Sequence, residues 1–234
     1  MSNSDSSEAL TQRNFVDVRA FGIALYDARE RESRLFDPLS SPRHDRVPRN
    51  RLIAYNRRLE VSHFRENNGW WDDSTLIVRI GGACRDNGGP RARGAWGVYF
   101  GSPSQYNANG RLSPDIPQTN ARADIESLWQ ALNILSSMNI VNGVALRDDI
   151  HDVRILTNSQ YLVNAMAKWM PGWIENGGRR PNGGRVRHFA TLKAINDRLD
   201  EMSSMLGGKL NIKFMYFPVE GYDTVGELAR SALD

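Results

Sequence analysis

The segment that most constrains the fold of this chain is residues 76–101, with the sequence LIVRIGGACRDNGGPRARGAWGVYFG. Its first five residues are apolar apart from Arg79, a composition typical of a central β-strand. The turn-forming residues 86–90 follow, and residues 95–100 are again apolar enough to form a strand. The segment therefore predicts a long antiparallel hairpin. The small residues 81–83 within it would let the backbone of a ligand approach closely.

The chain after this hairpin predicts helices and strands in alternation. Residues 121–138 predict a helix, because apolar residues recur there with helical spacing, at Ile125, Leu128, Trp129, Leu132 and Leu135. Strands are predicted at residues 152–156, parallel to the first strand, and at 210–219, with further helices at 159–168 and 189–206. Residues 102–117 are rich in Pro, Asn and Gly, so whether a third, edge strand forms there is open. The predicted fold class is α/β, a five-stranded mixed sheet that starts with an antiparallel hairpin and is flanked by helices.

Residues 1–73 form an N-terminal extension of different character, and residues 74–234 form the predicted domain. The polar and acidic residues 1–13 predict disorder, and residues 15–26 predict a strand or short helix. Residues 40–50 predict a loop, and residues 51–64 a helix with Leu52, Tyr55, Leu59 and Phe64 on one side. Two interpretations are open: a solvated spacer that packs partly on the domain, or an arm that docks nucleic acid or a protein partner.

Composition limits the classes of function. The 234 residues suit one domain plus an extension, and the net charge of +3 means that polyanion binding must be argued from where the charges lie. Most of the 30 basic residues are arginine, which suits bidentate phosphate contacts. A lone Cys84, a polar N-terminus and the lack of a long apolar run predict an intracellular protein, cytoplasmic or nuclear, neither secreted nor in a membrane.

Four segments, in the same order along the chain, resemble motifs of the ribonuclease H type 1 family. They are GGACRDNGG with VYFG after it, PQTNARAD at residues 117–124, LTNSQY at 156–161, and WMPGW with NGG between residues 169 and 178. The resemblance implies an RNase H-like fold for residues 74–234. The extension does not resemble the basic hybrid-binding module that precedes the catalytic domain in some relatives.

The resemblance also implies an activity, hydrolysis of the RNA strand of an RNA–DNA hybrid by two divalent metal ions held by four carboxylates. The matching positions here are Gly81, Asp124, Asn158 and Arg230, with Ala232 as the alternative to Arg230 if a small gap is allowed. Only Asp124 is acidic, so a pair of ions would meet one negative charge instead of four. We therefore expect at most weak metal binding, at Asp124, and no cofactor. Mg²⁺ or Mn²⁺ is expected only if other carboxylates take the place of the missing ligands. The candidates are Asp86, Glu126 and Asp223, which are otherwise interpreted as ordinary surface charges.

The positions that would contact nucleic acid have changed less. By resemblance, Cys84 and Asn87 contact RNA sugars, Gln118 and Asn120 contact bases and sugars, and Thr119 contacts a DNA phosphate. Trp169 and Trp173 match the DNA-strand channel, and a Gly/Pro loop with four arginines matches the family's basic protrusion, at Arg179, Arg180, Arg185 and Arg187.

Each of these residues also has a purely structural interpretation. Trp169 and Trp173, four residues apart, would pack one helical face against the sheet, and Cys84 would be a small buried residue. Residues 118–120 would cap the following helix, and the arginine loop would be a solvated tip.

Three hypotheses of function follow. The first is a catalytically degenerate RNase H-like domain that binds an RNA–DNA hybrid or RNA without cutting it. The second is an active hybrid endoribonuclease with substitute carboxylates. The third is a protein-interaction domain on the same fold, with residues 1–73 as part of its interface.

Overall fold

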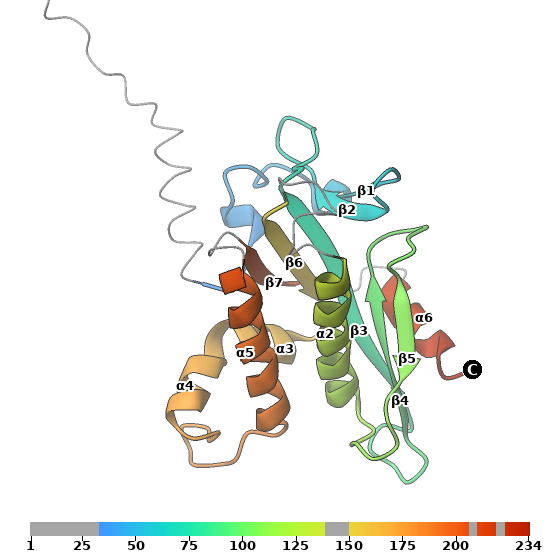
Figure 1. Cartoon of the computed structure of the whole chain (residues 1–234), viewed down its shortest axis with the longest axis vertical. Helices are drawn as coiled ribbons and strands as arrows, with labels where there is room; N and C mark the ends of the chain where they lie inside the picture. The colour runs from blue at the N-terminus through green and yellow to red at the C-terminus, as the bar shows by residue number, and fades with distance from the viewer. Residues whose placement is uncertain (1–32, 139–149, 206–209, 219–222) are drawn as a thin grey trace, which may run out of the picture.

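The structure is a computed structural model that describes residues 33–138, 150–205, 210–218 and 223–234. Its centre is one mixed sheet of seven strands (Figure 1). Strands β1 to β5 pair with one another in chain order, β6 pairs with β3 along the edge opposite to β4, and β7 pairs with β6. The strands are β1 (Ile53–Asn56), β2 (Val61–Phe64), β3 (Thr75–Arg85), β4 (Arg93–Tyr99), β5 (Ala108–Arg111), β6 (Asp152–Thr157) and β7 (Asn211–Tyr216). The α/β class predicted from the sequence is confirmed.

The predicted hairpin forms the middle of this sheet. Strands β3 and β4 are antiparallel, with Gly81 opposite Gly97 and Cys84 opposite Gly94. The first half of β3 also pairs in parallel with β6, which in turn pairs in parallel with β7. The long strand β3 therefore connects the antiparallel and the parallel halves of the sheet.

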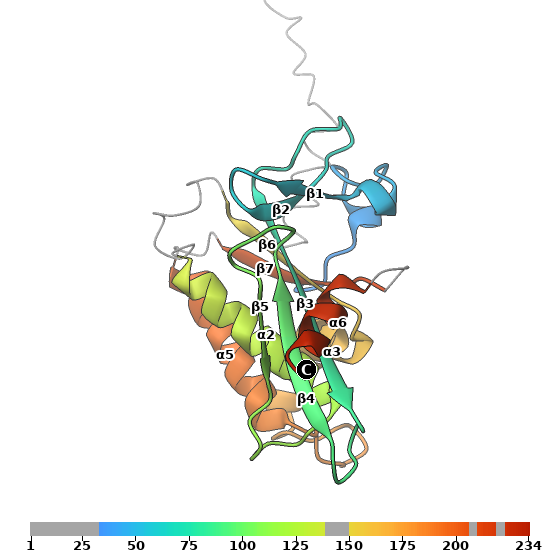
Figure 2. The same cartoon turned by 90° about the vertical axis from the view of Figure 1, so that its right-hand side faces the viewer.

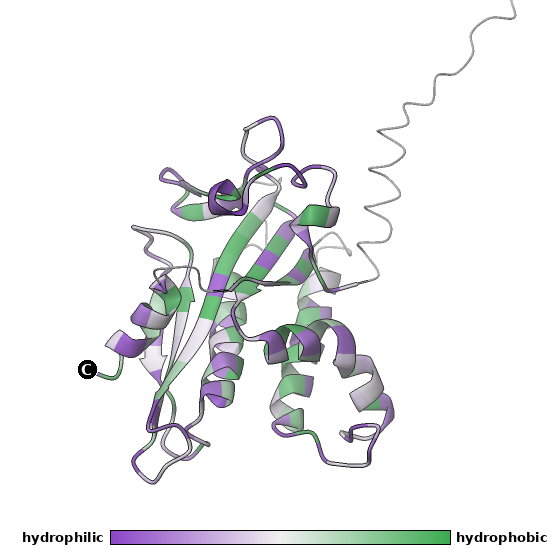
Figure 3. Cartoon of the chain, turned by 180° about the vertical axis from the view of Figure 1, so that it is seen from behind, coloured by the Kyte–Doolittle hydropathy of each residue, from purple (hydrophilic) through white to green (hydrophobic). Residues whose placement is uncertain are grey.

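Helices cover both faces of the sheet. Helices α2 (Asn120–Ser137) and α5 (Phe189–Met205) lie on one face, and α6 (Thr224–Ser231) lies on the other (Figure 2). Between β6 and α5 the chain forms α3 (Gln160–Asn164), a π-helical turn at Ala165–Trp169 and α4 (Met170–Glu175). Most of the predicted apolar stripe of α2 is buried in the core with Leu76, Val78 and Ile80 of β3, and Trp129 is partly buried against it. Apolar residues accordingly concentrate along the strands and the inner sides of the helices (Figure 3). None of the helices in the described part of the chain is both long and apolar enough to cross a bilayer.

Three local predictions differ from the structure. The prediction of a helix at residues 51–64 is wrong, because these residues form the β1–β2 hairpin. Strand β2 also pairs with β3, through Ser62 and Ile77. The sheet has seven strands instead of five, because this hairpin extends it and the open third strand does form, as the short β5. The predicted helix at residues 159–168 is interrupted by the π-helical turn. The predictions for residues 1–13 and 15–26 lie outside the described residues.

The described part of the N-terminal extension packs on the sheet. Short 3₁₀ turns at Pro38–Ser40 and Arg49–Arg51 interrupt its loop, and Leu35 and Phe214 of β7 form a β-bridge. A second, smaller apolar cluster joins the extension to three strands, and consists of Phe36, Leu52, Phe64, Ile77, Leu156 and Met215. The boundary between residues 73 and 74 stays a prediction, and β1 and β2 share the sheet of the predicted domain.

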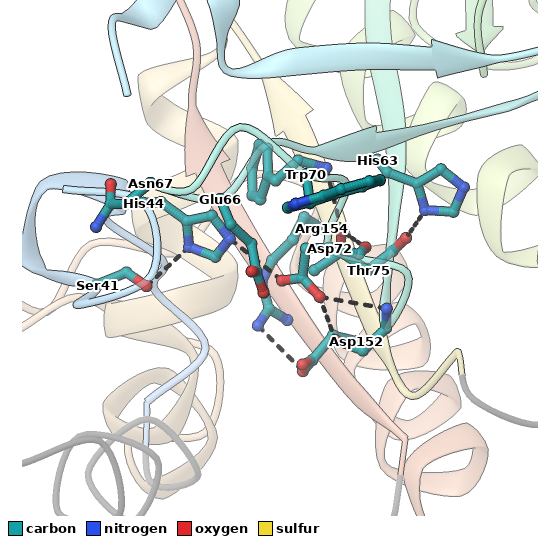
Figure 4. A network of polar contacts seen from close by, with 12 residues as sticks. Ser41, His44, His63, Glu66, Asn67, Trp70, Asp72, Thr75, Asp152 and Arg154 are labelled. Carbon is teal, nitrogen blue, oxygen red and sulfur yellow. Dashed lines mark hydrogen bonds and ion pairs between the residues drawn. The ribbon is translucent and has the colours of Figure 1, made fainter. Parts of the chain in front are cut away.

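A buried polar network fixes the same region (Figure 4). The hydroxyl of Ser41 lies 2.8 Å from Nδ1 of His44, and Nε2 of His44 lies 3.2 Å from a carboxylate oxygen of Asp72. Ser74 donates to the other oxygen of Asp72. Burial alone raises the pKa of Asp72, but the hydrogen bonds with His44 and Ser74 outweigh burial and lower this pKa to about 2. The network therefore favours an ionised Asp72 that holds two separate loops together.

Candidate nucleic-acid-binding site

Two adjacent glycines in the middle of β3 set the geometry of the candidate site. Successive residues of a strand point to opposite faces, so Gly82 faces α2 and Gly81 faces α6. A Cβ atom at Gly82 would lie 2.5 Å from the Cβ of Ala123 and from the backbone nitrogen of Asp124. Only glycine fits at position 82, because the N-terminal part of α2 lies directly on the backbone of β3.

On the opposite face, Gly81 lies against an apolar side chain of α6. A Cβ atom at Gly81 would lie 3.1 Å from Cγ1 of Val225, and one at the neighbouring Gly97 would lie 2.9 Å from the carbonyl oxygen of Val225. The residue of α6 that meets Gly81 is thus Val225 and not Arg230. A carboxylate at position 81 would point into this apolar contact.

In the described structure, the carboxylate of Asp124 contacts the glycine pair through a hydrogen bond. Its Oδ1 accepts a hydrogen bond of 2.8 Å from the N–H of Gly82. Burial raises the pKa of Asp124 to about 6, although hydrogen bonds with Ser159 and with the backbone of Gly82 act in the opposite direction.

The other positions that match metal ligands are not brought together as carboxylates. Asn158 is exposed directly after β6, and Arg230 is exposed and forms ion pairs with Asp223 at 3.3 Å and Glu227 at 2.8 Å. Arg79, two residues before Gly81 and therefore on the same face of β3, adds a partly buried cation. Its guanidinium lies 5.7 Å from the ring of Tyr99, and burial lowers its pKa.

The proposed substitute carboxylates are occupied elsewhere or exposed. Glu126 forms an ion pair with Arg122 at 3.0 Å, Asp223 caps α6 by accepting from Gly226 at 3.0 Å, and Asp86 lies in the exposed β3–β4 turn. Within residues 33–138, 150–205, 210–218 and 223–234, no group of three or more His, Cys, Asp or Glu side chains could hold a metal ion. The residues present do not fit a pair of divalent cations.

Residues that match the family's nucleic-acid contacts gather at the far end of β3, near the start of α2. Oε1 of Gln118 accepts from the N–H of Gly94 at 2.8 Å, and its amide nitrogen donates to Ser113 and Ile116. Gln118 therefore stabilises the loop before α2 with its own side-chain amide. Cys84, on the same strand, is partly buried, and burial raises the pKa of its thiol.

The next two residues complete the start of α2. Thr119 is the N-cap, and its hydroxyl accepts from the N–H of Arg122 at 3.2 Å, so the capping interpretation is confirmed for Thr119. The N–H of Asn120 donates to Oδ1 of Asn87 at 3.0 Å, which joins the β3–β4 turn to the helix. Asn87 and Asn120 are both exposed, and so a strand that ran along this edge could reach their side-chain amide groups.

An aromatic cluster and the arginine loop form a second part of the site. Trp173 is 7% exposed and packs in the core, while Trp169 is 40% exposed, with their ring centres 5.5 Å apart. Tyr161 lies 6.1 Å from Trp169, and its hydroxyl donates to the carbonyl of Arg187 at 3.4 Å. Packing thus accounts for Trp173, whereas the Trp169 ring stays partly open and is connected to the arginine loop through Tyr161.

The arginine loop has a defined shape. Arg179 and Arg185 form a β-bridge, and the N–H of Arg180 donates to the carbonyl of Gly184 at 2.8 Å. The loop carries four arginines, Arg179, Arg180, Arg185 and Arg187, and the side chains of all four are exposed. None of them forms an ion pair with a residue that the structure describes. The loop therefore presents four positive charges to the solvent.

The fold and the motif residues together define a domain of the RNase H class. A family model described as RNase H matches residues 73–221, and this chain belongs to that family. The family predicted from the four motifs is thereby confirmed.

Known proteins similar to this chain include ribonucleases H from mammals and bacteria. Ribonuclease H1 of Rattus norvegicus is 30% identical over 144 residues, which cover 62% of this chain and 44% of the relative. Ribonuclease HI of Rickettsia prowazekii is 27% identical over 167 residues, which cover 68% of this chain and 97% of the relative. The chain spans less than half the length of the mammalian relatives it matches.

Solved structures similar to this chain include a foamy viral protease–reverse transcriptase in complex with dsDNA. It has a TM-score of 0.49 and 18% identity, and the match covers 67% of this chain and 92% of that one. RNase H1 from Halobacterium salinarum has a TM-score of 0.41 and 18% identity, with 68% of this chain and 98% of that one covered.

Proposed function

We propose that this chain is a catalytically degenerate RNase H domain, a pseudoenzyme that binds an RNA–DNA hybrid or RNA and does not hydrolyse it. The observation that carries the proposal is the replacement of the metal site at Gly81. Where the family has its most central carboxylate, this chain has a glycine in contact with Val225, and a cation, Arg79, shares that face. Two Mg²⁺ ions need several shared anionic ligands, so hydrolysis by the family mechanism lacks its basis here.

The surface that would bind nucleic acid supports the other half of the proposal. The arginine loop would supply phosphate contacts, and Tyr161 connects it to the partly exposed ring of Trp169. Exposed Asn87 and Asn120 supply neutral hydrogen-bonding groups at the end of β3. Recognition of an RNA-containing duplex by shape and 2′-hydroxyl groups needs this combination of charge and neutral polar groups.

The test is a binding measurement in the absence of metal. Anisotropy of a labelled, blunt-ended RNA–DNA hybrid would be followed in EDTA between 50 and 200 mM salt, approximate limits within which affinity through several phosphate contacts falls steeply. Replacing the four loop arginines with glutamine should reduce the slope of log K against log salt by about 4, roughly one for each lost contact. Arg51→Gln, an exposed arginine outside the site, is the matched control and should leave the slope unchanged.

Two outcomes would contradict the proposal. Binding that is absent, or independent of salt and of the loop arginines, would favour the protein-interaction hypothesis, with residues 1–73 as the predicted docking element. Metal-dependent cleavage of the hybrid by the unmodified chain would favour an active ribonuclease with substitute carboxylates, the activity that the names of its relatives indicate for those proteins.

A further inference from the structure

A groove in the N-terminal extension lies apart from the proposed duplex-binding site. It lies between the β1–β2 turn and the loop before β3, and encloses about 980 Å³. Its lining combines three aromatic rings with two arginines, and consists of Tyr55, Asn56, Arg57, Arg58, Leu59, Gly69, Trp70, Trp71 and Asp73. The groove adjoins the first residues of β3, while the β3–β4 turn and the start of α2 lie at the other end of that strand (Figure 1).

Two tryptophans are unusually open to solvent in this groove. The Trp70 side chain is 75% exposed and Trp71 is 41% exposed. One side of Trp71 is supported by His63, a fully buried residue whose ring is nearly parallel, at 8°, with centres 6.4 Å apart. Nδ1 of His63 is in turn hydrogen-bonded to the carbonyl of Thr75 at 2.5 Å. The Trp71 ring is therefore held in place as a flat surface and leaves part of its area uncovered.

The loop that carries Trp70 is also held in place. The backbone carbonyl of Trp70 accepts from the N–H of Glu66 at 2.9 Å, and the N–H of Trp70 donates to Oδ1 of Asn68 at 2.8 Å. The side chain of Asn67 donates to the carbonyl of Pro42 at 2.9 Å and to Asp45 at 2.7 Å. A ligand that stacks on these rings would lose little free energy to ordering the loop, because the loop is already fixed.

The charge of the groove is positive. Arg57 and Arg58 are exposed in the β1–β2 turn, and neither forms an ion pair with any residue that the structure describes. The turn itself is fixed by Oδ1 of Asn56, which accepts from the N–H of Arg58 and of Leu59 at 3.0 and 3.3 Å. Asp73 is the carboxylate among the residues of the lining. Two guanidinium groups beside two open indole rings match a ligand that alternates anionic groups with flat aromatic ones.

We propose that this groove is a binding site for single-stranded nucleic acid, with bases stacked on Trp70 and Trp71 and phosphates bound by Arg57 and Arg58. Stacking of bases on aromatic side chains in a positively charged groove is the usual way in which proteins bind single strands. A proline-rich peptide would also stack on the rings, but it does not account for two unpaired arginines. The site is separate from the proposed duplex-binding site and does not depend on it.

The experiment uses the whole chain and a labelled single-stranded oligonucleotide of uniform sequence, oligo(U) or oligo(dT), with anisotropy as the readout. Trp70→Ala should raise the dissociation constant roughly 5- to 150-fold, the equivalent of one lost base stack. Trp70→Phe should restore most of the affinity, since a phenylalanine ring still stacks. Arg57→Gln and Arg58→Gln should each reduce the salt slope by about 0.7, the value for a phosphate contact of a single strand.

Matched controls separate this site from the rest of the surface. Leu39→Ala removes an apolar side chain that is 74% exposed outside the groove, and Arg51→Gln removes an exposed arginine outside it; both should bind the oligonucleotide normally. Trp70→Ala should leave binding of the blunt-ended hybrid unchanged. Failure of the hybrid to bind, with Trp70-dependent binding of the single strand, would contradict the proposed function and support this inference.

Two results would overturn the inference. One is single-strand binding that Trp70→Ala and the arginine variants leave intact. The other is no single-strand binding at low salt, including the case in which a proline-rich peptide binds the groove in a Trp70-dependent way.

Discussion

Replacing Asp124 with asparagine isolates the energetic effect of a partly buried carboxylate of α2 that is hydrogen-bonded to β3. The folded protein raises the pKa of Asp124 from 3.8 to about 6, because burial disfavours the ionised form. An asparagine keeps an oxygen that can accept from the N–H of Gly82, and it carries no charge at any pH.

The size and sign of the effect follow from linkage. Asp124 binds its proton more tightly when folded than when unfolded, so its contribution to stability is fully present below about pH 4 and is lost as the pH rises through about 6. A difference of about two pKa units corresponds to about 3 kcal/mol. Asp124→Asn should therefore gain stability relative to the unmodified chain by up to about 3 kcal/mol between pH 4 and pH 8.

The assay is urea unfolding of both proteins at several pH values across this range. Glu175→Gln, which neutralises an exposed carboxylate away from β3, serves as the control for the loss of one negative charge. A constant difference between Asp124→Asn and the unmodified chain from pH 4 to pH 8 would refute the reasoning, because it would mean that Asp124 is not held in a desolvating site.

The remaining predictions concern the contacts around the site and the extension. Asp72→Asn should cost about 2 kcal/mol of unfolding free energy at pH 7, and the loss should shrink below about pH 4 as the lowered pKa of Asp72 is approached; urea unfolding at pH 7 and pH 3 measures both. Gly81→Asp should cost roughly 1–3 kcal/mol against Val225. Val225→Ala in the same chain should recover part of that loss, and a double-mutant cycle without such coupling would disprove the contact. Thr119→Ala should cost about 1 kcal/mol by removing the cap of α2, measured by thermal unfolding.

Local patterns in the sequence were sufficient for the central hairpin and for α2. The apolar run of β3 and the Gly/Asn/Pro turn after it specify a hairpin almost independently of the rest of the chain, and α2 has a regular apolar stripe. Two of the four family motifs lie in this hairpin and at the start of α2, and the other two lie at residues 156–161 and 169–178; their common order along the chain identified the family correctly.

Residues 51–64 could not be predicted in the same way. Their apolar positions 52, 55 and 59 fit a helix as well as they fit two short strands, and the choice is made by pairing of Ser62 with Ile77 of β3. Pairing between separate segments overrides weak local preference. The groove at Trp70 and Trp71 depends on that hairpin, so two adjacent tryptophans were the one sign of it before folding.

The candidate site was predictable in its chemistry and not in its packing. The sequence shows that Gly81 and Asn158, at positions where the resemblance predicts carboxylates, are not acidic. The contact of Val225 with Gly81, by contrast, depends on how α6 packs on the sheet. The internal hydrogen bonds of Gln118 are likewise a product of the folded loop. Hydrogen bonds within the loop therefore explain the position of Gln118, while its contact with nucleic acid stays a prediction.

The central claim is that this RNase H domain holds nucleic acid without hydrolysing it, and cleavage of a labelled RNA–DNA hybrid tests it most directly. The unmodified chain, at concentrations at which the hybrid is bound, would be incubated with Mg²⁺ or Mn²⁺ alongside Asp124→Asn. We predict that the bound hybrid stays intact with either metal. Metal-dependent cutting that Asp124→Asn abolishes would contradict the account, because it would show that Asp124 takes part in a working metal site.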